Sequence, residues 1–298
     1  MKISRFIPKP TSDLPFSIGA PAIVWQVLFF YIPLLITVFS SILSFSSSGA
    51  FEKITFSKLS FFFTPVYLKV IGYSLLLAIS NTAICLLIAY PLAYFLAFAG
   101  KKFRNLLLFL LIVPFWTNFL LHVYAWFFVL ETHGFLNNML RHLGLIQEPI
   151  HFLNSVFAIM IMMVYYYLPF MVLPIYSSLE RFDYRLIEAS LDLGATWMQT
   201  FRRIILPLTL GGVRSGVFLV FIPSFGEFAI PELMGGDKIM FVGSVVSHFI
   251  LGEQTGSLGA AFTVVASIFL LIFAIALYWL INRFFIARRA DEKSQKAR

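Results

Sequence analysis

Residues Glu188–Pro207 read EASLDLGATWMQTFRRIILP, a polar stretch between two long apolar segments. The stretch contains two acids, two arginines, a glycine and a proline, whereas the segments on either side are almost free of charge. A plain membrane anchor has no need for such a pattern. The stretch therefore indicates a structured surface outside the bilayer that contacts either another protein or the lipid headgroups.

The composition of the whole chain is that of a membrane protein. Of its 298 residues, 60% are hydrophobic and 12% are charged, and the mean hydropathy is +0.89. A soluble domain is nearer half apolar and a quarter charged, so this chain cannot bury its apolar surface in one soluble core. Barrel strands would be shorter and would alternate, which leaves an all-α protein with six transmembrane helices. The predicted spans are 17–43, 71–98, 106–130, 152–179, 209–231 and 257–285.

The distribution of lysine and arginine predicts the orientation. Seventeen of the 22 lie in the two tails, in the 99–105 loop and between Arg181 and Arg214, and five lie in the connections on the other side. Cytoplasmic loops carry the excess of positive charge, so both termini are predicted to be cytoplasmic. The net charge of +8 is thus explained without nucleic acid. No repeat or linker divides the sequence, and residues 1–298 are interpreted as one membrane domain.

Two short helices are predicted in and just before the polar stretch. Asp183 is placed to cap the start of the first, and Gly194 to end it. Thr196 and Gln199 have the spacing of a capping box for the second, which Pro207 would stop before the next span. Two such helices at an angle would form a rigid surface for docking. The alternative is an amphipathic loop on the lipid headgroups, which suits the two arginines but not the acids.

The polar stretch also resembles a known motif. Glu188-Ala189-Ser190, followed by Gly194 and Leu206-Pro207, resembles the EAA loop of permease subunits of binding-protein-dependent ABC importers. Ser190 stands where that family usually has Ala. In the family, the short helix of this loop sits in a cleft of a cytoplasmic ATPase and carries its nucleotide-driven motion to the spans. The resemblance implies a coupling loop at about 180–208, with these coupling residues: Glu188, Ala189, Asp192, Gly194, Leu206 and Pro207.

The resemblance extends over most of residues 70–240 and narrows the family to polyamine importers. Val113–Asn118 (VPFWTN), Leu168–Tyr176 (LPFMVLPIY) and Gly226–Gly236 (GEFAIPELMGG) are similar to spermidine/putrescine permeases. The resemblance implies a type I ABC importer permease fold (MetI-like) in a bacterial inner membrane. It also implies a second homologous permease, an ATPase homodimer and a periplasmic polyamine-binding protein as partners. ATP and magnesium would be held by the ATPase, with no cofactor, metal or catalytic residue in this chain.

Glu227 is the main charge inside a predicted span, near the outer third of the fifth. An ionisable residue there is costly and usually faces a cavity or a partner. The ammonium groups of a polyamine need carboxylates or aromatic faces, so Glu227 is predicted to contact the substrate. Pro223 and Gly226 would loosen the helix and free carbonyl oxygens for a cation. The alternatives are a pair with a base of the partner permease or a place in interfacial water.

Four aromatic residues are further candidates for the substrate pathway. They are Trp116, Tyr124 and Trp126 in the third span and Tyr166 in the fourth. Trp116 and Tyr124 are eight residues apart, so they would share one face of a continuous helix. Tyr166 belongs to a run of three tyrosines, of which at most two can face one cavity. The alternative for all four is an aromatic belt at the membrane interface.

Other functions stay open at this stage. A permease for another small cationic solute would have the same features. An ion-driven secondary transporter would need intramembrane acids or interrupted helices in both halves, and Glu227 stands nearly alone. The sequence lacks a G-x-x-x-x-G-K-[ST] loop, so ATP hydrolysis is expected from another chain and this one is not interpreted as an enzyme. His122 is interpreted as a packing group, and Gly212 with Gly216 predicts close helix packing.

Overall fold

The computed structural model describes residues 16–45, 51–99, 102–236, 239–252 and 255–295. Six helical segments among these residues are long and apolar enough to cross a membrane. They are Gly19–Ile42, Pro65–Ala99, Phe119–His142, Val156–Glu180, Trp197–Phe225 and Gly256–Arg283. The prediction of a helical protein with six spans is therefore confirmed, with changes in the third and fifth spans.

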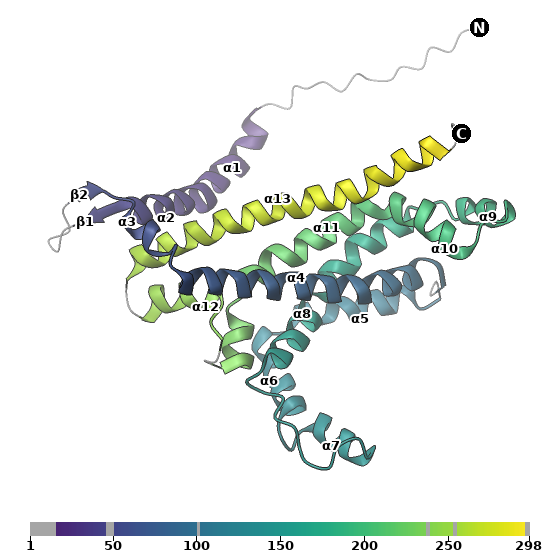
Figure 1. Cartoon of the computed structure of the whole chain (residues 1–298), viewed down its shortest axis with the longest axis horizontal. Helices are drawn as coiled ribbons and strands as arrows, with labels where there is room; N and C mark the ends of the chain where they lie inside the picture. Colours follow the sequence, from purple (N-terminus) through teal and green to yellow (C-terminus); the bar gives the residue numbers. More distant parts are fainter. Residues whose placement is uncertain (1–15, 46–50, 100–101, 237–238, 253–254, 296–298) are drawn as a thin grey trace, which may run out of the picture.

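The centre of the molecule is a bundle of three helices, α4 (Pro65–Tyr94), α8 (Val156–Glu180) and α11 (Leu206–Phe225), which pack on one another (Figure 1). Gly212 and Gly216 of α11 face α8. A Cβ on Gly216 would lie 2.7 Å from the sulfur of a methionine of α8, and one on Gly212 would collide with a backbone carbonyl oxygen of the same helix. The predicted close packing at this glycine pair is confirmed, and it lies within the subunit.

Two hydrogen bonds between side chains tie α4 to α11. Asn81 Nδ2 donates to Ser224 Oγ over 2.8 Å, and Tyr90 Oη lies 2.9 Å from Thr209 Oγ1. The two bonds are far apart along the helices, so they hold α11 against α4 toward both ends. In a buried, apolar setting no water competes for these groups, and the bonds therefore help to set the relative position of the two helices.

The first and last spans lie outside this bundle. The first consists of α1 (Phe16–Gln26), η1 (Val27–Tyr31) and α2 (Ile32–Ile42), and α2 packs beside α13 (Gly256–Gln295) (Figure 1). After α2 the chain forms an antiparallel hairpin of β1 (Leu43–Phe45) and β2 (Phe51–Ile54), with Leu43 opposite Ile54, and then α3 (Ser57–Phe61). Further helical elements are η2 (Phe95–Ala99), α9 (Arg185–Asp192), α10 (Trp197–Thr200), η3 (Phe201–Ile205), η4 (Pro231–Gly235), α12 (Val242–Ser247) and η6 (His248–Gly252).

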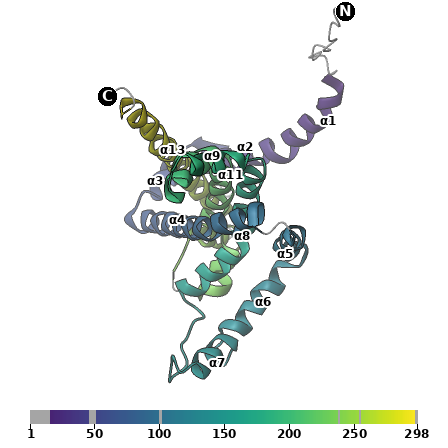
Figure 2. The ribbon, with the colours of Figure 1, turned by 90° about the vertical axis from the view of Figure 1, so that its right-hand side faces the viewer.

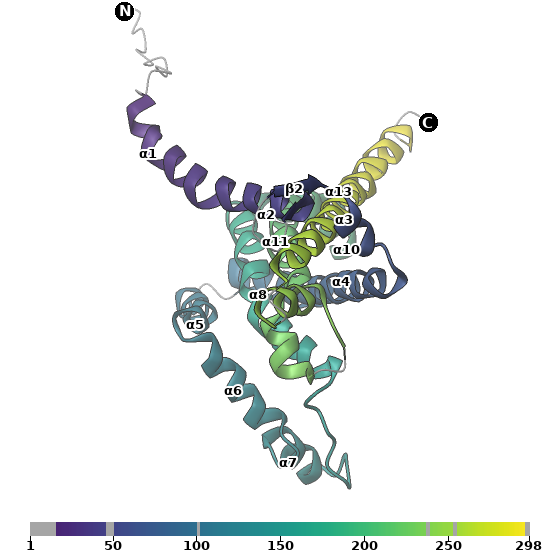
Figure 3. The ribbon, with the colours of Figure 1, turned by 90° about the vertical axis from the view of Figure 1, so that its left-hand side faces the viewer.

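The third predicted span, 106–130, is wrong as a single helix. It consists of α5 (Arg104–Trp116) and α6 (Phe119–Leu130), with Thr117 and Asn118 in extended conformations between them. A short turn then joins α6 to α7 (Phe135–His142). Figures 2 and 3 show α6 and α7 lying in line and projecting from the bundle, at an angle to α5.

The break between α5 and α6 has local causes. Pro114 has no N–H for a helical hydrogen bond, and Asn118 caps α6 by accepting a hydrogen bond from Leu120 N at 2.8 Å. His122 then holds the break to the bundle. Its Nε2 lies 2.9 Å from the carbonyl oxygen of Pro114, and its Nδ1 lies 2.9 Å from Tyr165 Oη of α8. These contacts agree with the interpretation of His122 as a packing group.

Candidate functional sites

The first helix of the polar stretch, α9, begins and ends close to its predicted signals. Asp183 stands one residue before the N-cap position, and its carboxylate accepts a hydrogen bond from Arg185 N at 3.1 Å. At the other end Gly194 has a φ of +80° and donates its N–H to Leu191 O at 2.9 Å, while the next N–H reaches Ser190 O. This is a Schellman cap, whose left-handed residue favours glycine.

The second predicted short helix is wrong as a separate element. Its capping box is present, because Thr196 Oγ1 accepts from Gln199 N at 3.3 Å and Gln199 Oε1 accepts from Thr196 N at 2.8 Å. From there α10, η3 and α11 follow without a break, so one long helix runs from Trp197 to Phe225. Pro207 does not stop this helix. It lies in the first turn of α11, directly after the wider π-helical turn η3, where the hydrogen-bond register changes and a missing N–H is tolerated.

α9 and the start of the long helix are fastened to each other and to the end of α4. Ser190 Oγ and Thr200 Oγ1 lie 2.9 Å apart in a buried contact, and Ile187 is fully buried. The rings of Tyr94 and Trp197 meet edge to face at 5.7 Å. Ser190, at the position where the resembled motif has Ala, therefore needs a small side chain because it lies between two packed helices.

The outward face of α9 carries both charge and apolar surface. Four of the predicted coupling residues are exposed together here: Glu188, Ala189, Asp192 and Gly194. Leu193 beside them is 88% exposed. Leu206 and Pro207 are half-buried in the long helix and do not belong to this face. The structure therefore brings four of the six predicted residues into one surface at one end of the bundle, with α12 at the opposite end (Figure 1).

Glu227 lies in the break between α11 and η4, not inside the fifth span as predicted. α11 ends with Gly226 as its C-cap, whose N–H bonds to Pro223 O at 3.2 Å. The Glu227 carboxylate then accepts hydrogen bonds from Tyr167 Oη at 2.6 Å and from Ala229 N at 3.1 Å. The helix is thus interrupted at the predicted Pro–Gly pair. A carboxylate offers about four acceptor positions, so this half-exposed one keeps room for donors of a ligand.

One residue of the tyrosine run of α8 contacts this break. Tyr167, rather than the predicted Tyr166, holds Glu227, and the rings of Tyr166 and Tyr167 lie 5.4 Å apart at right angles. Trp126 of α6 packs on Tyr165 at 5.6 Å. Tyr166 therefore contacts the Glu227 partner directly, whereas Trp126 contacts the neighbouring Tyr165. Tyr167 was missed because a run of three tyrosines does not show which ring faces inward.

Trp116 and Tyr124 do not share a helical face, because the chain breaks between them. Trp116 ends α5, is 76% exposed and packs at 6.0 Å on Phe109 of the same helix. Tyr124 lies on α6 and is 59% exposed. Among the described residues, neither side chain makes a hydrogen bond or ring contact with Glu227 or Tyr167.

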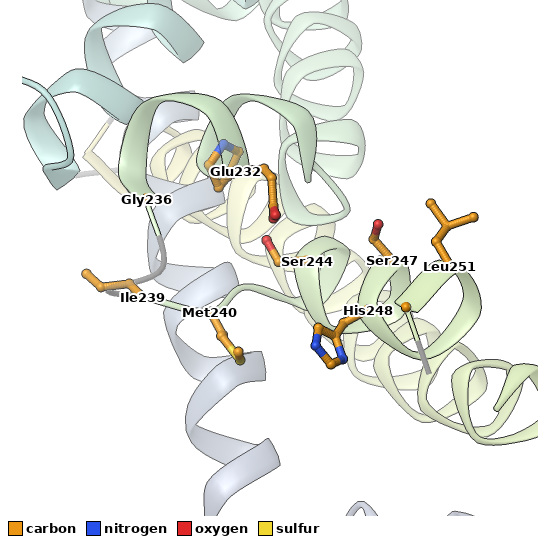
Figure 4. A pocket seen from close by; sticks show the side chains of 10 residues that line it. Glu232, Gly236, Ile239, Met240, Ser244, Ser247, His248 and Leu251 are labelled. Carbon is orange, nitrogen blue, oxygen red and sulfur yellow. The ribbon is translucent and has the colours of Figure 1, made fainter. Parts of the chain in front are cut away.

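A pocket of about 310 Å³ lies beyond the Glu227 break, between η4 on one side and α12 and η6 on the other (Figure 4). It is lined by Pro231, Glu232, Gly236, Ile239, Met240, Ser244, Ser247, His248, Leu251 and Gly252. Its described walls mix one carboxylate, two hydroxyls and the imidazole of His248 with apolar side chains. It is thus suited to a ligand with a charged end and an apolar body.

Comparison with known proteins places the fold and the family. The spermidine/putrescine transport system permease protein PotB of Salmonella typhimurium is 40% identical over 289 residues, which cover 95% of this chain and 99% of that protein. PotB of Escherichia coli strain K12 is 42% identical over 265 residues, 87% of this chain and 94% of that protein. A solved bacterial ABC transporter involved in the import of the acidic polysaccharide alginate has a TM-score of 0.68 at 16% identity, over 90% of this chain and 94% of that one.

The alginate transporter supports the fold alone, because its sequence identity is low. The relatives and the six apolar helices make this chain a multi-pass protein of a bacterial inner membrane. The family model for the binding-protein-dependent transport system inner membrane component matches residues 89–288, which is well over half of the chain. The chain therefore belongs to the family of binding-protein-dependent transport system inner membrane components.

Proposed function

We propose that this chain is the permease subunit of an ATP-driven importer of polyamines such as spermidine and putrescine. The observation that carries the proposal is the half-exposed carboxylate of Glu227, which lies in a break of the fifth span and bonds to Tyr167. A carboxylate beside tyrosine rings is the chemistry that an ammonium group needs. The identity of 40% with a spermidine/putrescine permease over 95% of the chain supports the same substrate class.

The exposed face of α9 docks on a cytoplasmic ATPase, which is present as a homodimer and holds ATP and magnesium. This chain forms one membrane domain with both termini in the cytoplasm, and it holds no cofactor and catalyses no reaction itself. A second homologous permease completes the pathway, and a periplasmic binding protein delivers the polyamine. The charge distribution supports this orientation, since the tails and the α9 side carry most of the lysine and arginine.

Movement of the ATPase reaches the substrate region through the long helix. The helix starts next to α9 and runs from Trp197 to the edge of the Glu227 break at Phe225, a length of about 42 Å. Because α9 is tied to this helix by the Ser190–Thr200 contact, a push on α9 displaces the start of the helix as well. Tilting of the long helix would move the Glu227 carboxylate relative to Tyr167 on α8.

A second candidate is a permease for another small organic cation. The Glu227 region is consistent with this candidate, because a single carboxylate binds one ammonium group and does not discriminate between cations of different length. An ion-driven secondary transporter is a weaker candidate. The helix breaks at Gly226–Glu227, which the sequence predicted, and at Thr117–Asn118, which it did not, provide interruptions in both halves. The family membership nevertheless favours a partner ATPase over an ion gradient.

The proposal is tested by reconstituting the chain with its partner permease, ATPase and binding protein in proteoliposomes. Uptake of radiolabelled putrescine and spermidine is measured with and without ATP on the ATPase side. We expect uptake that requires ATP and that falls when Glu227 is replaced by Gln. ATP-dependent uptake of a different cation with no polyamine uptake would favour the second candidate. Uptake driven by an ion gradient without the ATPase would contradict both.

A further inference from the structure

The pocket in Figure 4 has its own set of hydrogen-bond acceptors. Glu232 from η4 and Ser244 and Ser247 from α12 line it, and Figure 4 shows the Glu232 carboxylate and the Ser244 hydroxyl turned toward one another. Across the parts of the chain that the structure describes, none of these three side chains makes a hydrogen bond or an ion pair with another residue. The pocket therefore presents three oxygen-bearing groups whose hydrogen bonds are open to a ligand.

The walls of the pocket define the chemistry of that ligand. A primary ammonium group carries three N–H donors and no acceptor, which matches one carboxylate and two hydroxyls. Among the lining residues that the structure describes, none is a lysine or arginine, and the remaining polar side chain is the imidazole of His248. Ile239, Met240 and Leu251 supply apolar surface for methylene groups. A divalent metal ion is a poorer match, because calcium takes six to eight oxygen ligands and the described lining residues offer a single carboxylate.

We infer that this pocket binds one ammonium end of the incoming polyamine and forms a binding site that precedes Glu227 on the pathway. The inference deepens the proposed function and rests on it for the substrate class. Glu232 lies in the first turn of η4, five residues after Glu227 in the preceding break, so the pocket and the break are neighbours along the chain. A polyamine has at least two cationic ends, and two successive carboxylates let it advance without exposing either end to an apolar wall.

The test uses the reconstituted complex with Glu232→Gln and Ser244→Ala, and with Glu148→Gln as the matched control. Glu148 is an exposed acid outside this pocket, so its substitution makes the same change of charge. At saturating binding protein, we expect the maximal rate of spermidine uptake to fall about tenfold with Glu232→Gln and about threefold with Ser244→Ala. The control should match the wild type. n-Butylamine, which has a single ammonium group, should inhibit the wild type and lose its effect on Glu232→Gln.

Two results would overturn the inference. One is a Glu232→Gln complex with wild-type uptake and wild-type inhibition by n-butylamine. The other is a variant that changes only the concentration of binding protein needed for half-maximal uptake, because the pocket would then belong to the docking of that protein. If the wild-type complex imports no polyamine at all, the proposed function fails. The n-butylamine measurement then still tests the pocket on whichever cation is imported.

Arg214 carries a second, independent inference. The charge count grouped it with the cytoplasmic arginines, but it lies in the long helix about 12 Å from Leu206 and about 16 Å from Phe225, and so deeper in the apolar part of the helix than those loop residues. The side chain is half-buried and its Nε is fully buried without a hydrogen-bond partner. Within the described ranges of the chain, no carboxylate forms an ion pair with it; the ion pair seen there joins Arg104 to Glu180.

A charge at this depth is costly in hydrocarbon, so it faces a partner or a watery cavity. A free guanidinium on the pathway would also repel a polycation. We infer that Arg214 forms an ion pair with a carboxylate on a membrane span of the second permease, a partner that the proposed function supplies. The pair would remove both costs, because it neutralises the arginine and covers the exposed stripe of α11 beside it, which includes Gly211 and Ser215.

This inference is tested by co-purification of the second permease with a tagged form of this chain. Arg214→Lys should retain the partner, whereas Arg214→Leu should reduce its yield about fivefold and Arg214→Glu more strongly. An acid-to-lysine substitution in one span of the partner should restore Arg214→Glu. Wild-type recovery with Arg214→Glu would overturn the inference. So would the failure of every such substitution to restore it, which would favour a lipid phosphate. The readout is assembly, so it does not depend on which solute is imported.

Discussion

The two ends of the long helix Trp197–Phe225 are built in different ways. At the α9 end, the chain is closed by local caps, by the buried Ser190–Thr200 contact and by aromatic rings that pack on α4. At the other end the helix stops at Gly226, and the carboxylate of Glu227 is held by Tyr167, which lies 60 positions away in the sequence. One end is a continuous and tightly packed unit, whereas the other is interrupted and held by polar contacts between helices.

This difference shows how one helix can serve two tasks. A surface that receives force must move as one body with the helix behind it, and the continuous α10–η3–α11 segment meets that requirement. A surface that receives a cation must offer acceptors that can exchange partners. Glu227 meets that requirement because its hydrogen bonds are to a tyrosine hydroxyl and a backbone N–H, which an ammonium donor can replace.

Glu188→Lys is expected to reduce uptake more than any other substitution at either end of the long helix, because it reverses the charge in the centre of the exposed α9 face. Polyamine uptake should fall to background while the protein still inserts, since the exposed Glu188 side chain makes no hydrogen bond or ion pair with another described residue. Uptake and membrane yield of the variant are compared with those of Glu148→Lys. Coupled uptake at the wild-type rate would show that α9 does not dock on the ATPase.

Gly194→Asp should be nearly as severe. Gly194 has a left-handed backbone conformation, which is about 1 kcal/mol less favourable for a residue with a Cβ. The aspartate also adds a negative charge at the C-terminus of α9, where the helix dipole makes it unfavourable. Gly194→Asn separates the two causes, because asparagine tolerates this conformation and carries no charge. We expect uptake by the Asn variant to be intermediate. If both variants keep wild-type ATP-coupled uptake, the shape of the α9 end is unimportant for coupling.

Glu227→Gln tests the opposite end of the helix. The amide keeps the size of the side chain but loses the charge that attracts an ammonium group, so uptake should fall about tenfold with normal assembly of the complex. Tyr167→Phe, which removes only the hydroxyl donor, should have a smaller effect, about threefold. Uptake kinetics and the yield of intact complex are the measurements. Unchanged kinetics for Glu227→Gln would remove Glu227 from the pathway.

Ser190→Ala should have the smallest effect of these substitutions, and it tests how much the Ser190–Thr200 contact stabilises the α9 end. The change removes a neutral hydrogen bond, worth about 1 kcal/mol, but Thr200 Oγ1 keeps its bond to the carbonyl oxygen of Thr196 at 3.2 Å. The thermal midpoint of the purified complex should therefore fall only slightly. Ser190→Leu is the comparison, since a large side chain cannot fit between α9 and the long helix. A similar midpoint for both variants would show that this contact is not tightly packed.

The α9 end could be predicted almost residue by residue, because its signals are local. A capping box, a C-terminal glycine and an acid in the first turn act within four positions of sequence. Pro207 misled the prediction because the π-helical turn before it, which accommodates the ring, has no clear signature in the sequence. The boundary of the long helix was therefore wrong, even though Gly194 and the Thr196–Gln199 capping box were right and Asp183 was one residue from the N-cap.

The Glu227 end could be predicted only in part. Pro223 and Gly226 marked the interruption, but the partner of Glu227 is set by the packing of α8 on α11, which no spacing rule gives. The break at Thr117–Asn118 was missed because hydropathy measures the transfer of side chains, and the apolar run continues across it. Pro114 and the capping residue Asn118 were the available signals of the break. Their local effects end one helix and start the next although the apolar pattern is continuous.

The central claim is that the α9 end serves ATP hydrolysis and the Glu227 end serves the substrate. Its most direct test measures, in the same proteoliposomes, the ATPase rate stimulated by loaded binding protein and the polyamine imported per ATP hydrolysed. The account predicts that Glu188→Lys loses stimulation and uptake together, whereas Glu227→Gln keeps most of the stimulation and imports less per ATP. Equal loss of both quantities in the two variants, or full uptake with Glu188→Lys, would contradict it.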